Sequence, residues 1–223
     1  NEANKDAALA ATLGNTATWT DSPFGKALQL PGGAVSADIP AFPFFANKET
    51  LSITLRLRQD AVTAGQYALW LDRAILLQFG STQGGGDAND LRLRLNLEGD
   101  WRNSHTVRDT LSAGSWHHWA ITFDKGATTI YKDGQQVLAG TDTQTQFSNT
   151  TRTLFIGRRD ADGLQGAIDD LRFYDTALTA DQVAGLHNGN NKHDTTPPPG
   201  DYTFTYTAAD AADNTTTATH KIL

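Results

Sequence analysis

The 223-residue sequence contains neither cysteine nor methionine. Without cysteine the chain has no disulfide bond, no thiolate nucleophile and no cysteine-ligated zinc, so packing or a metal ion held by other ligands must stabilise the fold. Long hydrophobic runs are missing as well. No apolar stretch approaches the ~20 residues that span a bilayer, so we expect no membrane partner.

Positive charge is scarce. The 18 Lys and Arg residues are outnumbered by 25 Asp and Glu, which gives a net charge of −7 at pH 7. Because nucleic acids and anionic membranes are bound through dense Lys and Arg, neither is an expected partner. No E-x-D-x-x-E pattern supplies the carboxylate pair of a retaining glycosidase, and no G-x-S-x-G, H-E-x-x-H or P-loop motif occurs. The sequence therefore marks no catalytic residue, although spacing does not exclude a lyase built from Tyr, His and Arg.

Short extended segments separated by turn residues dominate what is present. Apolar residues make up 39% of the chain, which is enough for a sizeable core. Asp133-Gly134 is the strongest turn signal, because Asp-Gly favours the positive φ angles of a two-residue hairpin. The pattern predicts a multi-strand antiparallel sandwich with strands at 25–30, 50–58, 66–71, 74–80, 90–99, 115–124, 128–132, 135–139 and 152–159.

One helix is predicted after residue 178. Thr179 can cap its N-terminus, and Gln182 can reach back to complete a capping box. Val183 and Leu186 would face the interior, and Gly189 would end the helix. Such a short helix fits a lid or a plug rather than a layer of the fold.

The end of the chain has a different character. Residues 191–200 have the Asn, Thr and Pro content of a linker. Residues 201–223 contain two alternating strands around a turn, and a lone hairpin is marginally stable in water. The stretch GDYTFTYTAADAADN resembles the last two strands of a bacterial immunoglobulin-like module. The resemblance implies an incomplete module whose front strands are missing near Pro198 and Pro199.

Residues 1–190 resemble the laminin-G-like domains of the concanavalin A-like superfamily. The resemblance is carried by FGKALQLPGG, LSITLRLRQDAVTAGQYALW, SWHHWAITFDKGATTIYKDGQQV, LFIGRR and GAIDDLRFYDTAL. It implies an all-β fold, a concanavalin-like antiparallel β-sandwich (jelly roll) with one short helix. The resemblance says little about the ligand, because such domains serve as carbohydrate-binding modules, adhesin modules and enzyme accessories.

Two adjacent carboxylates fall in the middle of the last predicted strand of this region. Regular alternation puts Ile168, Asp170, Arg172 and Tyr174 on one face, and Asp169, Leu171 and Phe173 on the other. Both faces then mix apolar and charged residues, so Asp169 and Asp170 need compensating partners.

The resemblance implies that a structural calcium ion is one such partner, since Ca²⁺ accepts six to eight hard oxygen ligands. The matching ligands would be Asp169 or Asp170, a carbonyl of Gly32 or Gly33, and Glu2 or Asp6. The alternative is a salt bridge to Arg158, Arg159 or Arg172, or hydrogen bonds to a loop. A second candidate metal site, Asp87, Asn89 and Asp90, has the composition of an ordinary turn.

A glycan site needs aromatic rings for sugar C–H faces and polar side chains for hydroxyl groups. The segment 98–110 supplies both, in Trp101, Arg102, Asn103, His105 and Arg108; Tyr67 and Trp70 either line the concave face or fill the core. Trp101 needs either a ligand or a packing partner, and the alternative is that it shields a hairpin edge. For Trp116 and Trp119 we expect core positions, and Arg102 and Arg108 would suit sulfated or uronate chains.

These observations favour a non-catalytic polysaccharide-binding module of a larger secreted or surface protein, accessory to a polysaccharide-degrading enzyme. Its covalently linked neighbours would be carried to the glycan, raising their effective concentration there. Two alternatives stay open at this point. One is an adhesin or structural spacer without a glycan site, and the other is a cryptic polysaccharide hydrolase or lyase.

Overall fold

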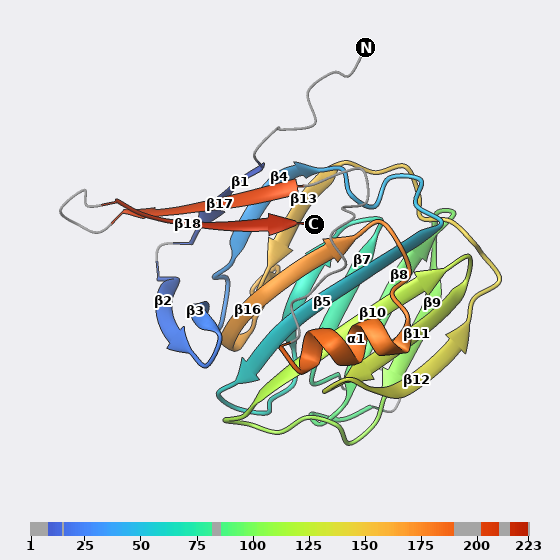
Figure 1. Ribbon diagram of the computed structural model, residues 1–223, viewed down its shortest axis with the longest axis horizontal. Coiled ribbons are helices and arrows are strands. Elements are labelled where there is room, and N and C mark those ends of the chain that lie inside the picture. Colours follow the sequence, from blue (N-terminus) through green and yellow to red (C-terminus); the bar gives the residue numbers. More distant parts are fainter. Residues whose placement is uncertain (1–8, 15, 82–85, 190–201, 210–214, 223) are drawn as a thin grey trace, which may run out of the picture.

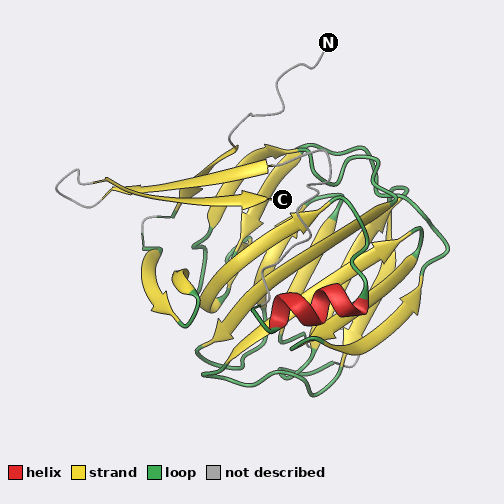
Figure 2. Cartoon of the chain, in the orientation of Figure 1, coloured by secondary structure: helices red, strands yellow, loops and turns green. Residues whose placement is uncertain are grey.

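The computed structural model describes residues 9–14, 16–81, 86–189, 202–209 and 215–222. Two large sheets pack face to face and form a β-sandwich (Figures 1 and 2). From edge to edge, the nine-stranded sheet contains β18 (Thr215–Ile222), β17 (Tyr202–Ala209), β1 (Leu9–Leu13), β4 (Ala37–Phe42), β13 (Arg152–Ile156), β6 (Gln66–Leu71), β7 (Ile75–Phe79), β8 (Leu91–Leu97) and β9 (Asp100–Val107). The seven-stranded sheet contains β12 (Gln135–Thr141), β11 (Ala127–Lys132), β10 (Trp116–Asp124), β5 (Thr50–Gln59), β16 (Gln165–Tyr174), β3 (Gly25–Pro31) and β2 (Thr18–Ser22). A small hairpin of β14 (Arg158–Arg159) and β15 (Asp162–Gly163) forms a separate two-stranded sheet that contacts β6.

The core lies between the two sheets and is built from alternating strand residues. In β8, Leu91, Leu93 and Leu95 are at most 1% exposed, whereas Arg92 and Arg94 between them are only partly buried. One end of the core is filled by contacting phenylalanine rings, namely Phe42, Phe44, Phe45, Phe123, Phe147 and Phe173. The predicted all-β sandwich with one short helix is confirmed.

The hairpin signal at Asp133-Gly134 is also confirmed. The two residues join β11 to β12 and have φ angles of 51° and 79°. Positive φ at both central residues is what a type I′ turn requires. Strands β1, β2, β4, β9 and β15 were not predicted. Strand β4 contains Pro40, and Ala41 has a φ of 52°, both of which are atypical of a strand interior.

The predicted helix is present as α1 (Ala180–His187). Both bonds of the capping box form, from Gln182 N to Thr179 Oγ1 at 3.3 Å and from Thr179 N to Gln182 Oε1 at 2.8 Å. Val183 is fully buried, Leu186 is partly buried, and Gly189 follows the helix with a φ of 72°. The helix packs on the outer face of the seven-stranded sheet, against Ala120, Tyr131, Tyr174 and Leu178 (Figure 1).

A β-bulge changes the predicted faces of β16. The register against β5 shifts between Asp169 and Arg172, and Asp170 has a φ of 51°. The extra residue returns Leu171 to the side of Ile168, so that Ile168, Leu171 and Phe173 all belong to the core. The prediction that Ile168 faces away from Leu171 and Phe173 was therefore wrong, because alternation assumed an unbroken ladder.

The two strands predicted in the tail are β17 and β18, which pair antiparallel with each other. Strand β17 also pairs in parallel with β1, from Leu9 opposite Phe204 to Ala11 opposite Tyr206. The tail hairpin thereby extends the nine-stranded sheet (Figure 2). The predicted linker 191–200 lies outside the described residues.

Candidate functional site

Two rows of side chains cross the outer face of the nine-stranded sheet. The strand registers place Phe155, Trp70, Leu76, Arg94 and Ser104 side by side in one row. The neighbouring row contains Tyr67, Gln78, Arg92 and Thr106. None of these side chains belongs to the core between the sheets. Since α1 lies on the other sheet, this helix does not cover them.

Bulges direct two aromatic residues onto this face. In β9, Asn103 pairs with Leu95 and Asp100 pairs with Leu97, so Trp101 and Arg102 both lie opposite Asn96. Strict alternation from Asn103 would turn Trp101 into the sandwich, and the extra residue turns it outwards. A second register shift, between Tyr67 and Leu69 in β6, does the same for Tyr67.

The indole rings of Trp70 and Trp101 stack on each other. Their centroids are 5.5 Å apart and their planes are 21° from parallel. Because β7 and β8 separate their strands, the two backbones are roughly 14 Å apart. The side chains therefore lean towards each other across the sheet, over Leu76, which is only 3% exposed. Both indoles remain partly exposed.

Arginine side chains lie beside this pair. The guanidinium carbon of Arg159 is 4.7 Å from the Trp70 ring centroid and 5.8 Å from that of Tyr67. That of Arg94 is 5.6 Å from the Trp101 ring, and its Nη2 donates to the Trp101 carbonyl at 2.5 Å. Burial lowers the pKa of Arg92, and the charges of Arg94 and Arg159 lower it further. We call these residues, Tyr67, Trp70, Trp101, Arg92, Arg94 and Arg159, the aromatic–arginine face.

The structure brings together three of the predicted sugar-binding residues, Tyr67, Trp70 and Trp101. Asn103 and His105 lie on the opposite face of β9 and are each 8% exposed. His105 Nε2 is 3.1 Å from Asp142 Oδ2, and Gly140 leaves room for its ring, because a Cβ there would be 2.7 Å from His105 Nδ1. These contacts tie β9 to β12. The side chain of Arg102 lies outside the described part of the chain.

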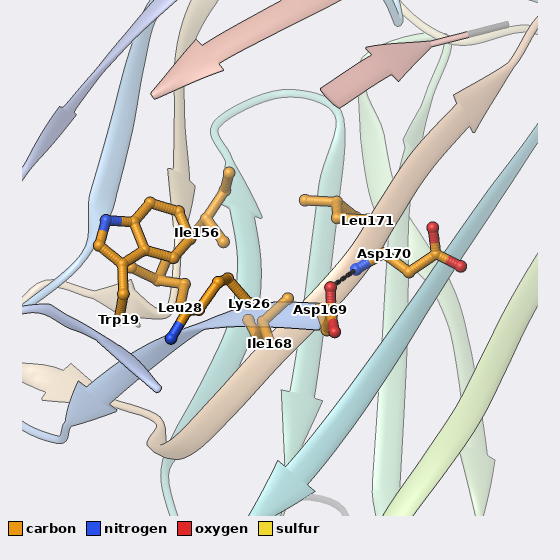
Figure 3. A pocket seen from close by; sticks show the side chains of 8 residues that line it. All are labelled: Trp19, Lys26, Leu28, Ile156, Ile168, Asp169, Asp170 and Leu171. Carbon is orange, nitrogen blue, oxygen red and sulfur yellow. Dashed lines mark hydrogen bonds between the residues drawn. The ribbon is translucent and has the colours of Figure 1, made fainter. Parts of the chain in front are cut away.

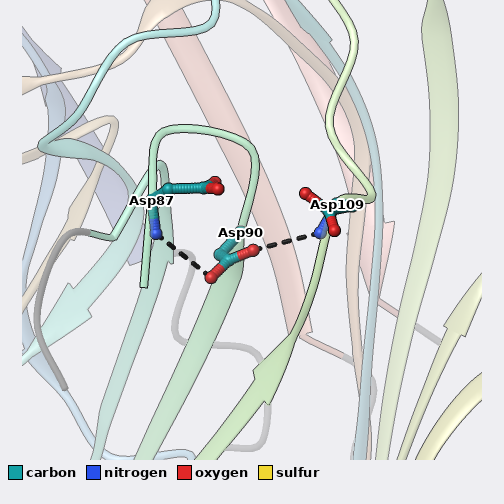
Figure 4. A group of neighbouring side chains, drawn as sticks. All are labelled: Asp87, Asp90 and Asp109. Atoms are coloured by element: carbon teal, nitrogen blue, oxygen red, sulfur yellow. Dashed lines mark hydrogen bonds between the residues drawn. The ribbon is translucent and has the colours of Figure 1, made fainter. Parts of the chain in front are cut away.

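Arg108 lies at the end of β9, where it binds Asp90. Its Nη1 donates to Asp90 Oδ2 at 3.0 Å, and the backbone N–H of Asp109 donates to Asp90 Oδ1 at 3.0 Å. Asp87 N also donates to Asp90 (Figure 4). The ligand atoms of Asp87, Asp90 and Asp109 all lie within 4.8 Å of one another. The buried Asp90 carboxylate thus closes a turn and already holds a cation, that of Arg108.

Asp169 and Asp170 have partners within the protein. Asp169 accepts hydrogen bonds from Ser22 Oγ and, at 2.7 Å, from the Asp170 N–H. Asp170 accepts from Arg172 Nε at 2.6 Å and lies 3.8 Å from Arg56 Nε. Of the salt bridges considered from the sequence, only the one to Arg172 forms in the described structure.

A small cavity lies beside these carboxylates (Figure 3). Its walls are the side chains of Trp19, Lys26, Leu28, Ile156, Ile168 and Leu171, with Asp169 and Asp170 at one end. Gly32 does not line it. A Cβ on Gly32 would meet Gln165, four residues before Asp169 and so roughly 13 Å away along β16. Glu2 and Asp6 lie outside the described residues, so the calcium site stays a prediction.

The two tryptophans expected in the core, Trp116 and Trp119, differ in burial. Trp119 is 1% exposed and lies in the core as predicted. Trp116 is only partly buried and is not a core residue, contrary to the prediction, because it lies at the start of β10. Its ring meets Phe24 edge to face, with 6.5 Å between centroids, and lies 5.5 Å from the guanidinium carbon of Arg58.

Neither Arg92 nor Arg94 was predicted as a site residue, and Arg159 was expected only as a salt-bridge partner. The alternating segment LRLRLNL, residues 91–97, could have identified Arg92 and Arg94. If its leucines face the core, its arginines must share the outer face.

A family model described as the concanavalin A-like lectin/glucanases superfamily matches residues 31–184. No curated protein sequence matches the chain. Among solved structures, domain 4 of AbnA, a GH43 extracellular arabinanase from Geobacillus stearothermophilus in complex with arabinotriose, is similar. It has 24% identity and a TM-score of 0.64 over 79% of this chain and 87% of that domain.

The ligand-binding domain of botulinum neurotoxin serotype D, in complex with N-acetylneuraminic acid, is also similar. It has 11% identity and a TM-score of 0.64, over 80% of this chain and 45% of that one. At these identities the likeness shows the fold. The described residues contain no helix with the length and hydrophobicity to cross a membrane.

Proposed function

The chain belongs to the concanavalin A-like lectin/glucanase superfamily, and on that premise we propose that it is a non-catalytic module that binds a polysaccharide. The observation that carries the proposal is the stacked Trp70–Trp101 pair on the outer face of the nine-stranded sheet. Partly exposed indoles present apolar surface to the C–H faces of sugar rings. Each indole covers one face of the other, so the pair offers a ligand its exposed edges and the parts of the outer faces that Arg94 and Arg159 leave open.

The polar side chains around the pair supply the other half of sugar recognition. Arg92 Nε donates to Ser104 Oγ at 3.2 Å, which links the row that contains Trp70 to the neighbouring row. Guanidinium and hydroxyl groups at such positions can bind sugar hydroxyl groups and so fix the orientation of a chain. Tyr67 is only 5% exposed, so the accessible aromatic surface is that of Trp70 and Trp101. Their place on a sheet face suits a polymer that extends beyond the site in both directions.

The arabinanase domain provides a parallel for the biological role, since it is one domain of an extracellular enzyme. We propose that this chain likewise belongs to a larger secreted or surface protein and holds a polysaccharide-degrading domain close to its substrate. The tail hairpin would then be the end of an immunoglobulin-like neighbour. The gain comes from effective concentration, and no chemical step is assigned to this module.

Affinity electrophoresis through gels containing arabinan, xylan, alginate, polygalacturonate or carrageenan tests the proposal. We expect at least one of these polymers to retard the protein. Trp70→Ala and Trp101→Ala should each abolish that retardation while leaving the fold intact, because each removes half of the stacked pair.

Trp116→Ala is the matched control, since it removes another partly buried indole from the opposite sheet. It should migrate like the parent protein in every gel. Retardation that survives both Trp70→Ala and Trp101→Ala would show that the site lies elsewhere. A parent protein that no polymer retards would contradict the proposed function.

A further inference from the structure

We propose that the ligand of the aromatic–arginine face is an anionic polysaccharide, whose sulfate or carboxylate groups are bound by Arg94 and Arg159. This inference rests on the proposed function, because it specifies the ligand of the same face. Three observations carry it: the position of the two guanidinium groups, the absence of strong acidic partners for them, and the contrast with the other arginines.

The first observation is position. Arg159 lies over Trp70 and Arg94 over Trp101, so the two arginines lie against different members of the stacked pair. A guanidinium group that uses its flat surface against an aromatic ring keeps its N–H groups directed outwards in its own plane. That edge matches the two oxygens of a carboxylate or of a sulfate ester. A sugar that contacts the indoles would bring its charged substituent to this edge.

The second observation concerns partners. Arg94 donates to a neutral carbonyl, that of Trp101, and forms no ion pair with any described residue. Arg159 lies 3.7 Å from Asp160 Oδ2, but that carboxylate is 86% exposed, and such contacts neutralise little charge. The Nε atoms of Arg94 and Arg159 have no hydrogen-bond acceptor among the described residues, but they are buried, so an anion would be bound through the Nη groups. No carboxylate strongly neutralises either guanidinium group, so each can still pair with an anion.

The third observation is that several other arginines of the chain form closer ion pairs. Arg58 lies 3.0 Å from Asp60, Arg158 lies 3.1 Å from Asp38, and Arg172 lies 2.6 Å from Asp170. In a chain of net charge −7, Arg92, Arg94 and Arg159 gather positive charge at this face. A polyanion is repelled by the molecule as a whole and attracted at this face, which favours a single mode of docking.

Titration calorimetry with alginate, carrageenan and arabinan tests the inference, since these polymers carry carboxylate groups, sulfate groups and no charge, respectively. We expect alginate or carrageenan to bind more tightly than arabinan, and the preferred polymer identifies the anion. Binding should weaken when NaCl is raised from about 0.05 to about 0.5 M. Arg94→Gln and Arg159→Gln should each lower the affinity for that polymer about tenfold.

Arg58→Gln is the matched control, because Arg58 lies over Trp116 on the other sheet and is paired with Asp60. Its affinity should equal that of the parent. An equal loss in Arg58→Gln would mean that only total charge matters, and would overturn the inference. If Arg94→Gln and Arg159→Gln leave the affinity unchanged while Trp101→Ala still abolishes binding, the protein does not recognise the charged groups of the polymer. The inference is then wrong, and the proposed function stands without it. If none of the polymers binds the parent protein, the proposed function itself fails.

Discussion

The imidazole rings of His118 and His187 lie 5.9 Å apart, one on β10 and the other at the end of α1. His118 is 2% exposed, and the Nδ1 atoms of both rings are buried without a hydrogen-bond partner among the described residues. Arg56 lies in the same region, where its Nη2 donates to the carbonyls of Leu186 and His187, each at 3.0 Å. A buried ring without a hydrogen-bond partner beside a guanidinium group favours the neutral form of His118, so the contact between the helix and the sheet depends on that form.

This arrangement makes stability dependent on pH. The pKa of His118 is lowered from 6.5 to about 4, mainly by burial and also by the nearby charges of Arg56 and His187. In the unfolded chain His118 binds a proton near pH 6.5, whereas in the folded chain it does so only near pH 4. The stability that neutral His118 contributes is therefore complete above pH 6.5 and is lost as the pH falls towards 4. We expect the free energy of unfolding to decrease by roughly 3 kcal/mol over that range.

Urea unfolding at several pH values measures the effect. His118→Gln, which cannot bind a proton, should show a flatter dependence between pH 6.5 and 4 than the parent. A variant that loses as much stability as the parent over this range would place the titrating group elsewhere.

Gly166 fixes the register of β16 between β3 and β5. A Cβ at this position would lie 2.1 Å from the carbonyl oxygen of Arg58, which belongs to the backbone of β5 and cannot move independently. We expect Gly166→Ala to destabilise the protein by about 3 kcal/mol or more. Gly185→Ala in α1 is the control. A Cβ there meets nothing within 4 Å, so this change should stabilise the helix by about 0.5–1 kcal/mol. Chemical denaturation of both variants checks the two signs.

The Asp169 carboxylate holds the bulge of β16 in place. It accepts the Asp170 N–H, which the shifted register leaves without a ladder partner, and it lies near the charge of Arg56. Asp169→Ala removes both interactions as well as the hydrogen bond from Ser22 Oγ, and we expect a loss of about 2–4 kcal/mol. Asp169→Asn keeps an acceptor for the N–H and should lose less. If denaturation midpoints show equal losses, charge rather than the hydrogen bond is the larger contribution.

The predicted calcium ion gives a separate outcome at the same residue. A ligand bound only by the folded state raises the melting temperature by mass action. If Asp169 or Asp170 holds calcium, a chelator should lower the melting temperature of the parent protein, and added Ca²⁺ should restore it. The Asp169→Asn variant should respond less to the chelator. Identical melts of the parent with and without chelator would leave Arg56, Arg172 and Ser22 as the partners of these carboxylates.

Local signals in the sequence predicted much of the fold. Asp133-Gly134 and the Thr179–Gln182 capping box specify their turn and helix start through contacts within four residues, so they can be found without the tertiary structure. Strand β9 could not be recognised in this way. Its polar residues serve contacts with other strands, such as the pairing of His105 with Asp142.

The candidate site was predicted only in part, because the faces of its strands depend on bulges. Period-2 alternation assigns faces correctly in β8, where Arg92 and Arg94 lie between core leucines. It fails for Trp101 and Ile168, since each lies beside an extra residue that only the partner strand defines. The Trp70–Trp101 pair joins residues 31 positions apart, and no local pattern links them.

The bulge in β9 makes the site depend on strand register as well as on residue type. If β9 paired with β8 as a regular ladder from Asn103 without the bulge, Trp101 would lie opposite Leu97, and its indole would face the leucines of the interior. A relative could therefore keep every aromatic and arginine residue of the face and still lack the site, if its β9 formed no bulge. When relatives of this chain are aligned, matching residues alone do not establish the stacked pair, because the register of β9 decides which way Trp101 points.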